Sequence, residues 1–152
     1  LRLVDDNEAD IELARIMLLE ESNLRCNLLT ARDAYVAMEI LRSNVGGSSM
    51  VDLLLLDINM PGMDGFELLE EMRANEALKD VPVLICSTSS YDKDMERAKM
   101  LGAIGYLAKP VELDKLKPFL ERIGHLRLSR DDQGHVLSRA TVPGAGFAAS
   151  DL

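Results

Sequence analysis

The chain has 152 residues, which is the size of one ordinary domain. Its 17 basic and 26 acidic residues give a formal net charge of −9, so no overall positive field attracts a nucleic-acid backbone. Hydrophobic residues make up 47% of the sequence, enough for a buried core, and only 4% are aromatic, too few for a surface on which bases stack. Composition therefore predicts one globular domain and excludes a free-standing nucleic-acid binder.

Short apolar runs alternate with longer segments of helical period along residues 1–123. Strands are expected over residues 1–4, 26–29, 51–56, 81–86 and 104–107. Helices are expected from a cap at Asp10 to near Ser22, from a cap at Asp33 through Leu41, from Asp64 through Met72, from about Asp92 to Leu101, and from Leu113 to Ile123. This alternation predicts an α/β domain in which five helices cover both faces of a doubly wound, five-stranded parallel sheet.

Residues 124–152 follow this set of five βα units and are predicted to lie outside the domain of residues 1–123, as an extension or tail. We expect residues 125 to about 138 to extend the last helix or to form an arm that turns near Asp131 to Gly134 and packs across a second copy in a homodimer. The reason is that four apolar side chains have no place in the completed core: Leu126, Leu128, Val136 and Leu137. Residues 142–152 are expected to be a flexible tail, and residues 46–49 a break in the chain.

Cysteine usage and hydropathy bear on the cellular compartment. Cys26 and Cys86 lie in apolar runs and form no CxxC unit, which favours buried, reduced thiols and a cytoplasmic protein. No stretch approaches the roughly 18 apolar residues of a membrane span, so we expect no membrane partner. The chain begins at Leu1 inside a predicted strand, which favours a natural sequence that starts further upstream.

Polar residues stand where the predicted strands end. Asp5 and Asp6 follow the first strand, Asp57 the third, Ser87 the fourth and Lys109 the fifth. Ligands of open parallel sheets bind outside the carboxyl ends of the strands, so these side chains should share one crevice. Three clustered carboxylates repel one another unless a hard cation neutralises them, which predicts a Mg²⁺ site with an open side for a phosphoryl group.

Such a pocket gives three residues a chemical role. Asp57 is the candidate nucleophile, because carboxylates form aspartyl-phosphate intermediates. Lys109 would neutralise one phosphoryl oxygen, and the Ser87 hydroxyl would donate a hydrogen bond to another. Each residue alone also fits a structural role, such as a turn, a cap or a solvated side chain. Their joint occurrence at strand ends favours the functional interpretation.

Four motifs carry a family resemblance. They are LVDDN at 3–7, LLLLDINMPGMDG at 53–65, PVLICSTS at 82–89 and GAIGYLAKP at 102–110. In order and spacing they resemble the receiver domains of two-component response regulators, over about residues 1–123. The resemblance implies a flavodoxin-like fold with strand order 2-1-3-4-5. It extends to single-domain, chemotaxis-regulator-like members, including those paired with phytochrome-type histidine kinases.

The resemblance implies a role for each carboxylate of the pocket. Asp57 would be the phosphoacceptor. Asp6 and Asp57 would bind Mg²⁺ directly together with the backbone carbonyl of Asn59, and Asp5 would act mainly through a coordinated water.

It also implies how a signal leaves the site. Ser87 and Lys109 would contact the phosphoryl group, and Tyr106 would turn inward when Ser87 shifts toward the phosphate. The peptide between Lys109 and Pro110 would be cis. One departure is Thr88, where the family usually has Ala, and a larger side chain there would crowd the path of Tyr106 or of a phosphodonor.

Three functions are candidates for such a site. The first is a phosphorylation switch that takes its phosphoryl group from a sensor histidine kinase and acts through a downstream protein or phosphotransfer partner. It would catalyse only its own phosphotransfer and slow autodephosphorylation. The second is a Mg²⁺-dependent phosphohydrolase, but the haloacid dehalogenase-like enzymes carry an Asp general acid where this chain has Asn59. The third is a binding module that no longer takes phosphate, against which the retention of every site residue type argues.

Overall fold

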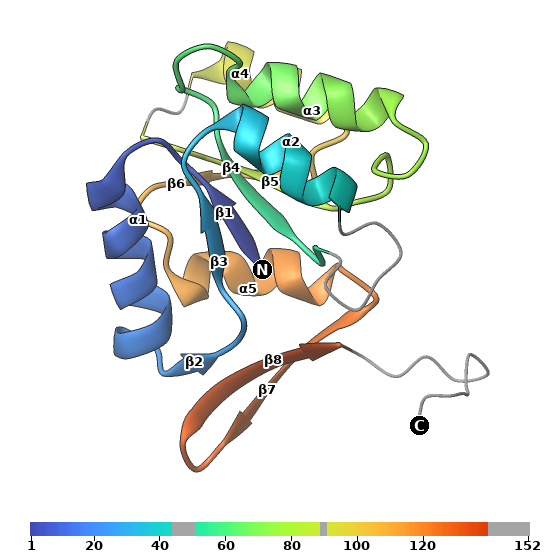
Figure 1. The fold of residues 1–152 in the computed structure, drawn as a ribbon. Helices are drawn as coiled ribbons and strands as arrows, with labels where there is room; N and C mark the ends of the chain where they lie inside the picture. The colour runs from blue at the N-terminus through green and yellow to red at the C-terminus, as the bar shows by residue number, and fades with distance from the viewer. Residues whose placement is uncertain (44–50, 89–90, 140–152) are drawn as a thin grey trace, which may run out of the picture.

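A five-stranded parallel sheet forms the centre of the domain in the computed structural model, which describes residues 1–43, 51–88 and 91–139. Its strands lie in the order β3-β1-β4-β5-β6 (Figure 1). Their bounds are β1 Arg2–Val4, β3 Leu29–Ala31, β4 Leu54–Asp57, β5 Val83–Ser87 and β6 Gly105–Ala108. Because β3 is the second strand of this sheet along the chain, the predicted order 2-1-3-4-5 is confirmed.

Helices cover both faces of the sheet. Their bounds are α1 Glu8–Arg15, continued by a π-helix η1 Ile16–Glu21, then α2 Ala34–Ser43, α3 Gly65–Ala74, α4 Asp92–Met100 and α5 Leu113–Glu121. Side chains of α2, α3 and α4 pack in one core cluster, and those of α1, η1 and α5 in the other. Successive strand side chains point to opposite faces, so Leu54 and Leu56 join the first cluster while Leu53 and Leu55 join the second. The nearly continuous apolar run of β4 is explained by this double burial.

Polar side chains cap several of the helices. Asp64 and Glu67 form a capping box at the start of α3, and the Asp33 carboxylate accepts a hydrogen bond from the Val36 N–H at 2.7 Å. The expected cap of the first helix was wrong. Asn7, not Asp10, caps α1, because the Asn7 side chain accepts from the Asp10 N–H at 3.1 Å. Asp10 therefore lies inside the first turn of the helix.

The chain after residue 123 differs from the sequence expectation. Residues 126–139 form an antiparallel hairpin of β7 Leu126–Asp131 and β8 Gly134–Arg139, so the expected extension of the last helix is wrong. The expected turn between Asp131 and Gly134 is confirmed. β8 also pairs in parallel with β2 Leu24–Arg25, which completes a second, three-stranded sheet with the order β2-β8-β7.

This pairing also corrects the second predicted strand. Residues 24–25 belong to the small sheet, and the strand of the large sheet starts at Leu29, not at Cys26.

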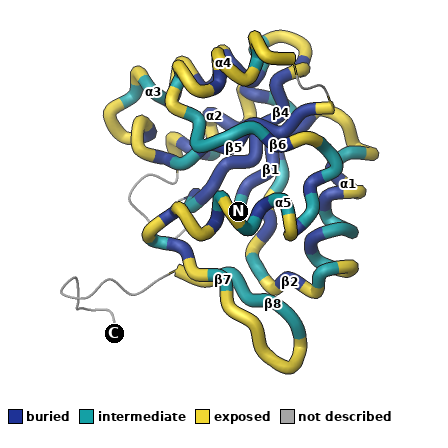
Figure 2. The backbone as a smooth tube through the Cα atoms, turned by 180° about the vertical axis from the view of Figure 1, so that it is seen from behind, coloured by how far each residue is buried: buried dark blue, intermediate teal, exposed yellow. Residues whose placement is uncertain are grey.

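The hairpin packs against its own domain. Leu126 is buried in the cluster that holds α1 and α5, and Leu128 and Leu137 pack against that cluster, so three of the four side chains expected to lack a place in the core do contact it. In Figure 2 the tip of the hairpin is exposed, as are the residues at the end of β8. The expected break at 46–49 and tail at 142–152 lie outside the described residues.

Two further expectations concern the thiols and the membrane. Cys86 is buried, whereas Cys26 is only half-buried, and both are free thiols. Within the three described ranges, no helix has the length and apolar character needed to span a bilayer.

Candidate functional site

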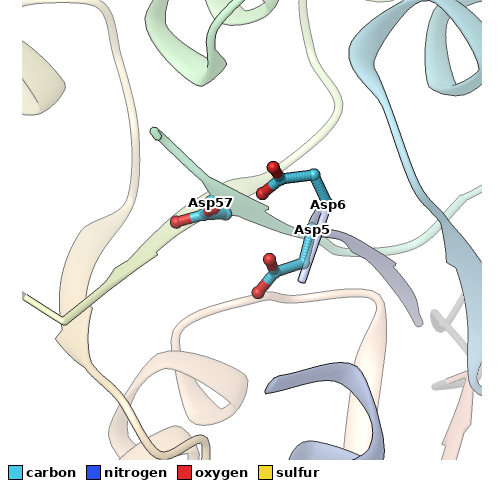
Figure 3. Close-up of side chains that lie close together, drawn as sticks. All are labelled: Asp5, Asp6 and Asp57. Atoms are coloured by element: carbon cyan, nitrogen blue, oxygen red, sulfur yellow. The ribbon is translucent and has the colours of Figure 1, made fainter. Parts of the chain in front are cut away.

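Three carboxylates meet at the carboxyl end of the sheet. Strands β1 and β4 are neighbours in register, with Val4 opposite Leu56, so the residues that follow Val4 come to lie beside Asp57. One oxygen each of Asp5, Asp6 and Asp57 lies within 4.8 Å of the others (Figure 3). Asp5 and Asp57 are only 1% and 4% exposed, whereas Asp6 is open to solvent. The structure therefore brings these three carboxylates together, as the sequence predicts.

Lys109 places one positive charge beside this cluster. Its Nζ donates hydrogen bonds to Asp5 Oδ2 at 2.6 Å and to Asp10 Oδ2 at 2.9 Å, and lies 3.4 Å from Asp57 Oδ1. Burial by itself lowers the pKa of Lys109, but the hydrogen bonds to Asp5 and Asp10 and the charges of Asp57 and Asp5 outweigh it and raise that pKa above its usual value. The ammonium therefore stays charged at neutral pH.

The surroundings of Asp57 disfavour its charged form, whereas those of Lys109 favour the charged ammonium. Burial and the neighbouring Asp5 charge raise the pKa of Asp57 from 3.8 to about 6, against the lowering effect of Lys109 and of the Asn59 N–H that bonds it. The two causes are desolvation and like-charge repulsion, and a bound cation would relieve the repulsion. A carboxylate whose charge is this poorly compensated is a common feature of functional sites.

The predicted switch residues occupy neighbouring strands. Ser87 is fully buried at the end of β5, and Tyr106 is half-buried on β6, where it packs against the cluster under α2, α3 and α4. The register pairs Ser87 with Ala108, and the Lys109 N–H donates to the Ser87 carbonyl at 2.7 Å. The sheet thus sets Ser87 directly beside the backbone of Lys109.

Two local features next to Lys109 concern the Pro110 peptide and Thr88. The peptide between Lys109 and Pro110 is cis, as the resemblance implies. Thr88 is exposed and lines a cavity of about 200 Å³ together with Asp10, Leu13 and Lys109. Thr88 therefore stands at the mouth of the site and not within its buried part.

The loop after β4 is held close to the strand. The Gly65 N–H donates to the Ile58 carbonyl at 3.2 Å, and a Cβ on Gly65 would lie 2.3 Å from the Asp57 carbonyl oxygen. Only glycine permits this approach of the α3 start to the end of β4. Asn59, whose carbonyl the resemblance implies as a metal ligand, lies exposed in this loop.

Sequence reasoning missed Asp10 as a site residue. The sequence pattern favours Asp10 as the helix cap, although Asn7 three positions earlier is an equally good capping residue. With Asn7 as the cap, Asp10 lies in the first turn of α1 and its side chain accepts a hydrogen bond from Lys109.

The donor set fits a magnesium ion. The three clustered side chains offer only carboxylate oxygens, which hard divalent cations prefer, and the exposed Asp6 leaves the cluster open on one side. The charge of the cluster supports the fit as well, because Lys109, the one buried ammonium close to these carboxylates among the residues that the structure describes, does not balance them.

Comparison with known proteins places the chain in a family. Residues 1–121 match the model of the response regulator receiver domain. The chain is 34% identical over 122 residues to the "Probable methanogenesis regulatory protein FilR2" of Methanothrix harundinacea, which covers 80% of this chain and 78% of FilR2. It is 33% identical over 123 residues to the response regulator Rcp1 of Synechocystis, covering 80% and 83% of the two chains. It spans only 18% of the rice two-component response regulator ORR23, at 30% identity.

Solved structures agree in fold. The bacteriophytochrome response regulator AtBRR aligns with a TM-score of 0.68 at 31% identity, over 81% of this chain and 90% of AtBRR. The phosphorylated cyanobacterial phytochrome response regulator RcpA aligns with a TM-score of 0.63 at 34% identity, over 82% and 89%. The Mn²⁺-bound form of Rcp1 aligns with a TM-score of 0.62 at 33% identity, over 80% and 88%.

The chain therefore belongs to the response regulator receiver domains, the signalling switches of two-component signal transduction.

Proposed function

We propose that this receiver domain takes a phosphoryl group from the phosphohistidine of a sensor kinase onto Asp57, in a reaction that depends on Mg²⁺. The observation that carries the proposal is the nearly buried Asp57 carboxylate, which lies within reach of two further carboxylates and of the Lys109 ammonium. In the transfer, an Asp57 oxygen forms the new bond to phosphorus as the bond from phosphorus to the histidine nitrogen breaks, and that nitrogen leaves with the bonding electrons.

The metal would be held by Asp6, Asp57 and the Asn59 carbonyl, with Asp5 acting through a water. Mg²⁺ bound there offsets the negative charge that would otherwise repel the incoming phosphoryl group. Lys109 supplies a positive charge to one phosphoryl oxygen, and the Ser87 hydroxyl donates a hydrogen bond to another. The buried position of Ser87 and the hydrogen bonds of Lys109 to Asp5 and Asp10 support these roles.

The response would pass from Ser87 to Tyr106. A shift of Ser87 toward the phosphoryl group leaves space on the sheet, and Tyr106 turns inward to fill it, which changes the population of two surface conformations. The half-buried position of Tyr106 on the strand next to β5 supports this step. The acyl phosphate would then be lost by slow autodephosphorylation.

The partners belong to the same proposal. A sensor histidine kinase would donate the phosphoryl group, and a downstream protein or phosphotransfer protein would receive the signal in the cytoplasm. A phytochrome-type kinase is the proposed donor, because the aligned structures AtBRR and RcpA are named as phytochrome response regulators. The homodimer stays a prediction, and light scattering on the full chain tests it.

Labelling by a small phosphodonor tests the function. Acetyl phosphate with Mg²⁺ should add one phosphoryl group to the parent, detected by intact mass, and chelation of the metal should prevent it. Asp57→Asn should abolish the adduct because an amide is a poor nucleophile, while Asp92→Asn, an exposed carboxyl in α4, should leave it unchanged. An adduct on Asp57→Asn at the parent's yield would refute the assignment, and rapid turnover of para-nitrophenyl phosphate would favour a phosphohydrolase instead.

A further inference from the structure

Asp10 contacts Lys109 from outside the carboxylate cluster. It lies in the first turn of α1, where the Asn7 cap fixes its backbone, and its Oδ2 accepts a hydrogen bond from Lys109 Nζ at 2.9 Å. The group of carboxylates whose oxygens could share one metal ion contains Asp5, Asp6 and Asp57 but not Asp10. Asp10 is thus a partner of the lysine without being a candidate ligand of the metal.

This difference matters when a cation enters. A lysine ammonium has three hydrogens, and Lys109 directs them to a region with Asp5 at 2.6 Å, Asp10 at 2.9 Å and Asp57 at 3.4 Å. Two of these three carboxylates are the ones that a metal ion would draw on. An ammonium that paired only with Asp5 and Asp57 would compete with the metal ion for both carboxylates.

The first turn of α1 is a suitable place for a fixed counter-charge. The N-terminal end of a helix favours a negative side chain, and the hydrogen bond from the Asp10 N–H to the Asn7 side chain fixes the direction of that turn. The Asp10 side chain is 29% exposed, while that of Lys109 is only 8% exposed. Both line the cavity of about 200 Å³ beside α1, and Asp10 is the more exposed member of this ion pair.

We propose that Asp10 is a positioning residue that tethers the Lys109 ammonium at the α1 side of the site. The hydrogen bond to Asp10 reduces the competition between the Lys109 ammonium and the metal ion for Asp5 and Asp57. It also holds the Lys109 Nζ in place for a phosphoryl oxygen. The second of these effects rests on the proposed function, and the first concerns Mg²⁺ binding alone.

A double-mutant cycle measured by calorimetric Mg²⁺ titration separates the tether from a general charge effect. Asp10→Asn should weaken Mg²⁺ binding about threefold to tenfold in the parent, the scale of a partly buried ion pair. In the Lys109→Gln background the same change should weaken it less than about twofold, because no ammonium is left to tether. Asp10→Glu, which keeps the carboxylate, should recover part of the parent affinity.

Glu8→Gln is the matched control. Glu8 lies in the same helical turn and pairs with Arg32 at 2.6 Å, so its loss removes one negative charge near the site without touching Lys109. It should weaken Mg²⁺ binding equally in both backgrounds. An equal loss for Asp10→Asn in both backgrounds, no loss in the parent, or a gain would each overturn the tether.

Beryllofluoride, which mimics the phosphoryl group on a carboxylate, gives the second readout. With Mg²⁺ saturating, Asp10→Asn should require about threefold to tenfold more beryllofluoride for half-saturation, again only when Lys109 is present. If the parent itself fails to bind beryllofluoride while the Mg²⁺ coupling is found, the proposed function fails and the tether stands. If the parent binds it and Asp10→Asn behaves like the parent in both titrations, the tether fails and the proposed function stands.

Discussion

The charge of Asp57 is costly to the folded chain without a cation. Its carboxylate is nearly buried and faces Asp5, and the two causes together raise the pKa of Asp57 to about 6. A folded-state pKa above the unfolded value means that the folded state binds more protons between about pH 4 and pH 6. The contribution of Asp57 to stability therefore falls as pH rises through this window, and Asp57 destabilises the fold above it.

Asp57→Asn should therefore stabilise the metal-free protein at pH 7. We expect a gain of about 1–2 kcal/mol in the free energy of unfolding, because an amide does not ionise and so avoids the cost of a buried charge. Urea unfolding of parent and variant at a series of pH values measures it. The gain should disappear near pH 4, and saturating Mg²⁺ should reverse it, since the cation binds the parent more tightly. A variant less stable than the parent at pH 7 without metal would contradict this account.

Lys109→Arg tests the link from the site to the switch. Arginine keeps the charge but replaces a compact ammonium with a planar fork, so we expect beryllofluoride still to bind while the NMR signals of Tyr106 shift less than in the parent. Lys115→Arg is the control, because Lys115 is a neighbouring lysine that donates to the carbonyls of Ala108 and Pro110 and pairs with Glu112 at 4.0 Å, and not with the carboxylates of the site. Equal Tyr106 shifts in the parent and Lys109→Arg would show that the coupling does not depend on the shape of the cation.

The residues at strand ends could be predicted from the sequence, and Asp10 could not. Asp5, Asp57 and Lys109 each follow a strongly apolar run, and parallel strands bring their carboxyl ends to one edge whatever their exact bounds. The position of Asp10 instead depends on which of two polar residues caps α1. A shift of three residues in a helix start turns a cap into a site residue.

At the scale of elements, the end of β4 and the start of α3 form one unit. The capping box of Asp64 and Glu67 fixes the first turn of α3, and Gly65 lets that turn approach the Asp57 carbonyl. The backbone that carries Asp57 is therefore braced by the helix that follows it.

Gly65→Ala should disturb the site more than the loss of the cap does. Its Cβ would meet the Asp57 carbonyl oxygen at 2.3 Å, so the backbone must move, at a cost of about 1–3 kcal/mol in unfolding free energy. Asp64→Ala removes the cap for about 1 kcal/mol and leaves that contact intact. We expect acetyl phosphate to label Gly65→Ala more slowly than Asp64→Ala at equal folded fraction. Equal labelling rates would mean that the bracing does not reach Asp57.

The elements at the edge of the sheet were harder to place from sequence than those at its centre. β4 and β5 are buried along their whole length, and a strand with apolar side chains on both faces is expected at the centre of a sheet that is covered on both sides. Residues 24–31 divide between two sheets, because β2 pairs with a strand more than a hundred residues later in the chain. No local pattern in residues 24–31 reports such a distant partner.

At the scale of the whole molecule, the hairpin is attached at both of its sides. Arg25 pairs with Asp131, and His135 Nδ1 lies 3.1 Å from the Ser22 carbonyl oxygen. Near the foot of β4, Asp52 accepts from Arg139 Nε at 3.0 Å, and His125 Nε2 lies 3.2 Å from the Asp52 carbonyl oxygen. With Leu126 in the core, these contacts make residues 126–139 part of the folded domain, although the family match ends at residue 121.

Shortening the chain after Gly124 should therefore destabilise it. The change removes the buried Leu126 and takes from β2 its only strand partner among the described residues, so we expect a loss of at least about 2 kcal/mol in unfolding free energy. A chain that ends at Arg139 keeps every described element and is the control. Equal urea midpoints for the two shortened chains would contradict a structural role for the hairpin.

The place of the hairpin also bears on the order of events during synthesis. The chain leaves the ribosome from its N-terminus, and a domain generally folds as a unit, so early segments wait for the later ones that complete it. Strand β2 is made early, yet its partner β8 is made after every strand of the large sheet. The region around Leu24 must therefore wait for its strand partner until residues 135 and 136 have emerged. We expect this interval to be the time at which the nascent chain is most dependent on chaperones.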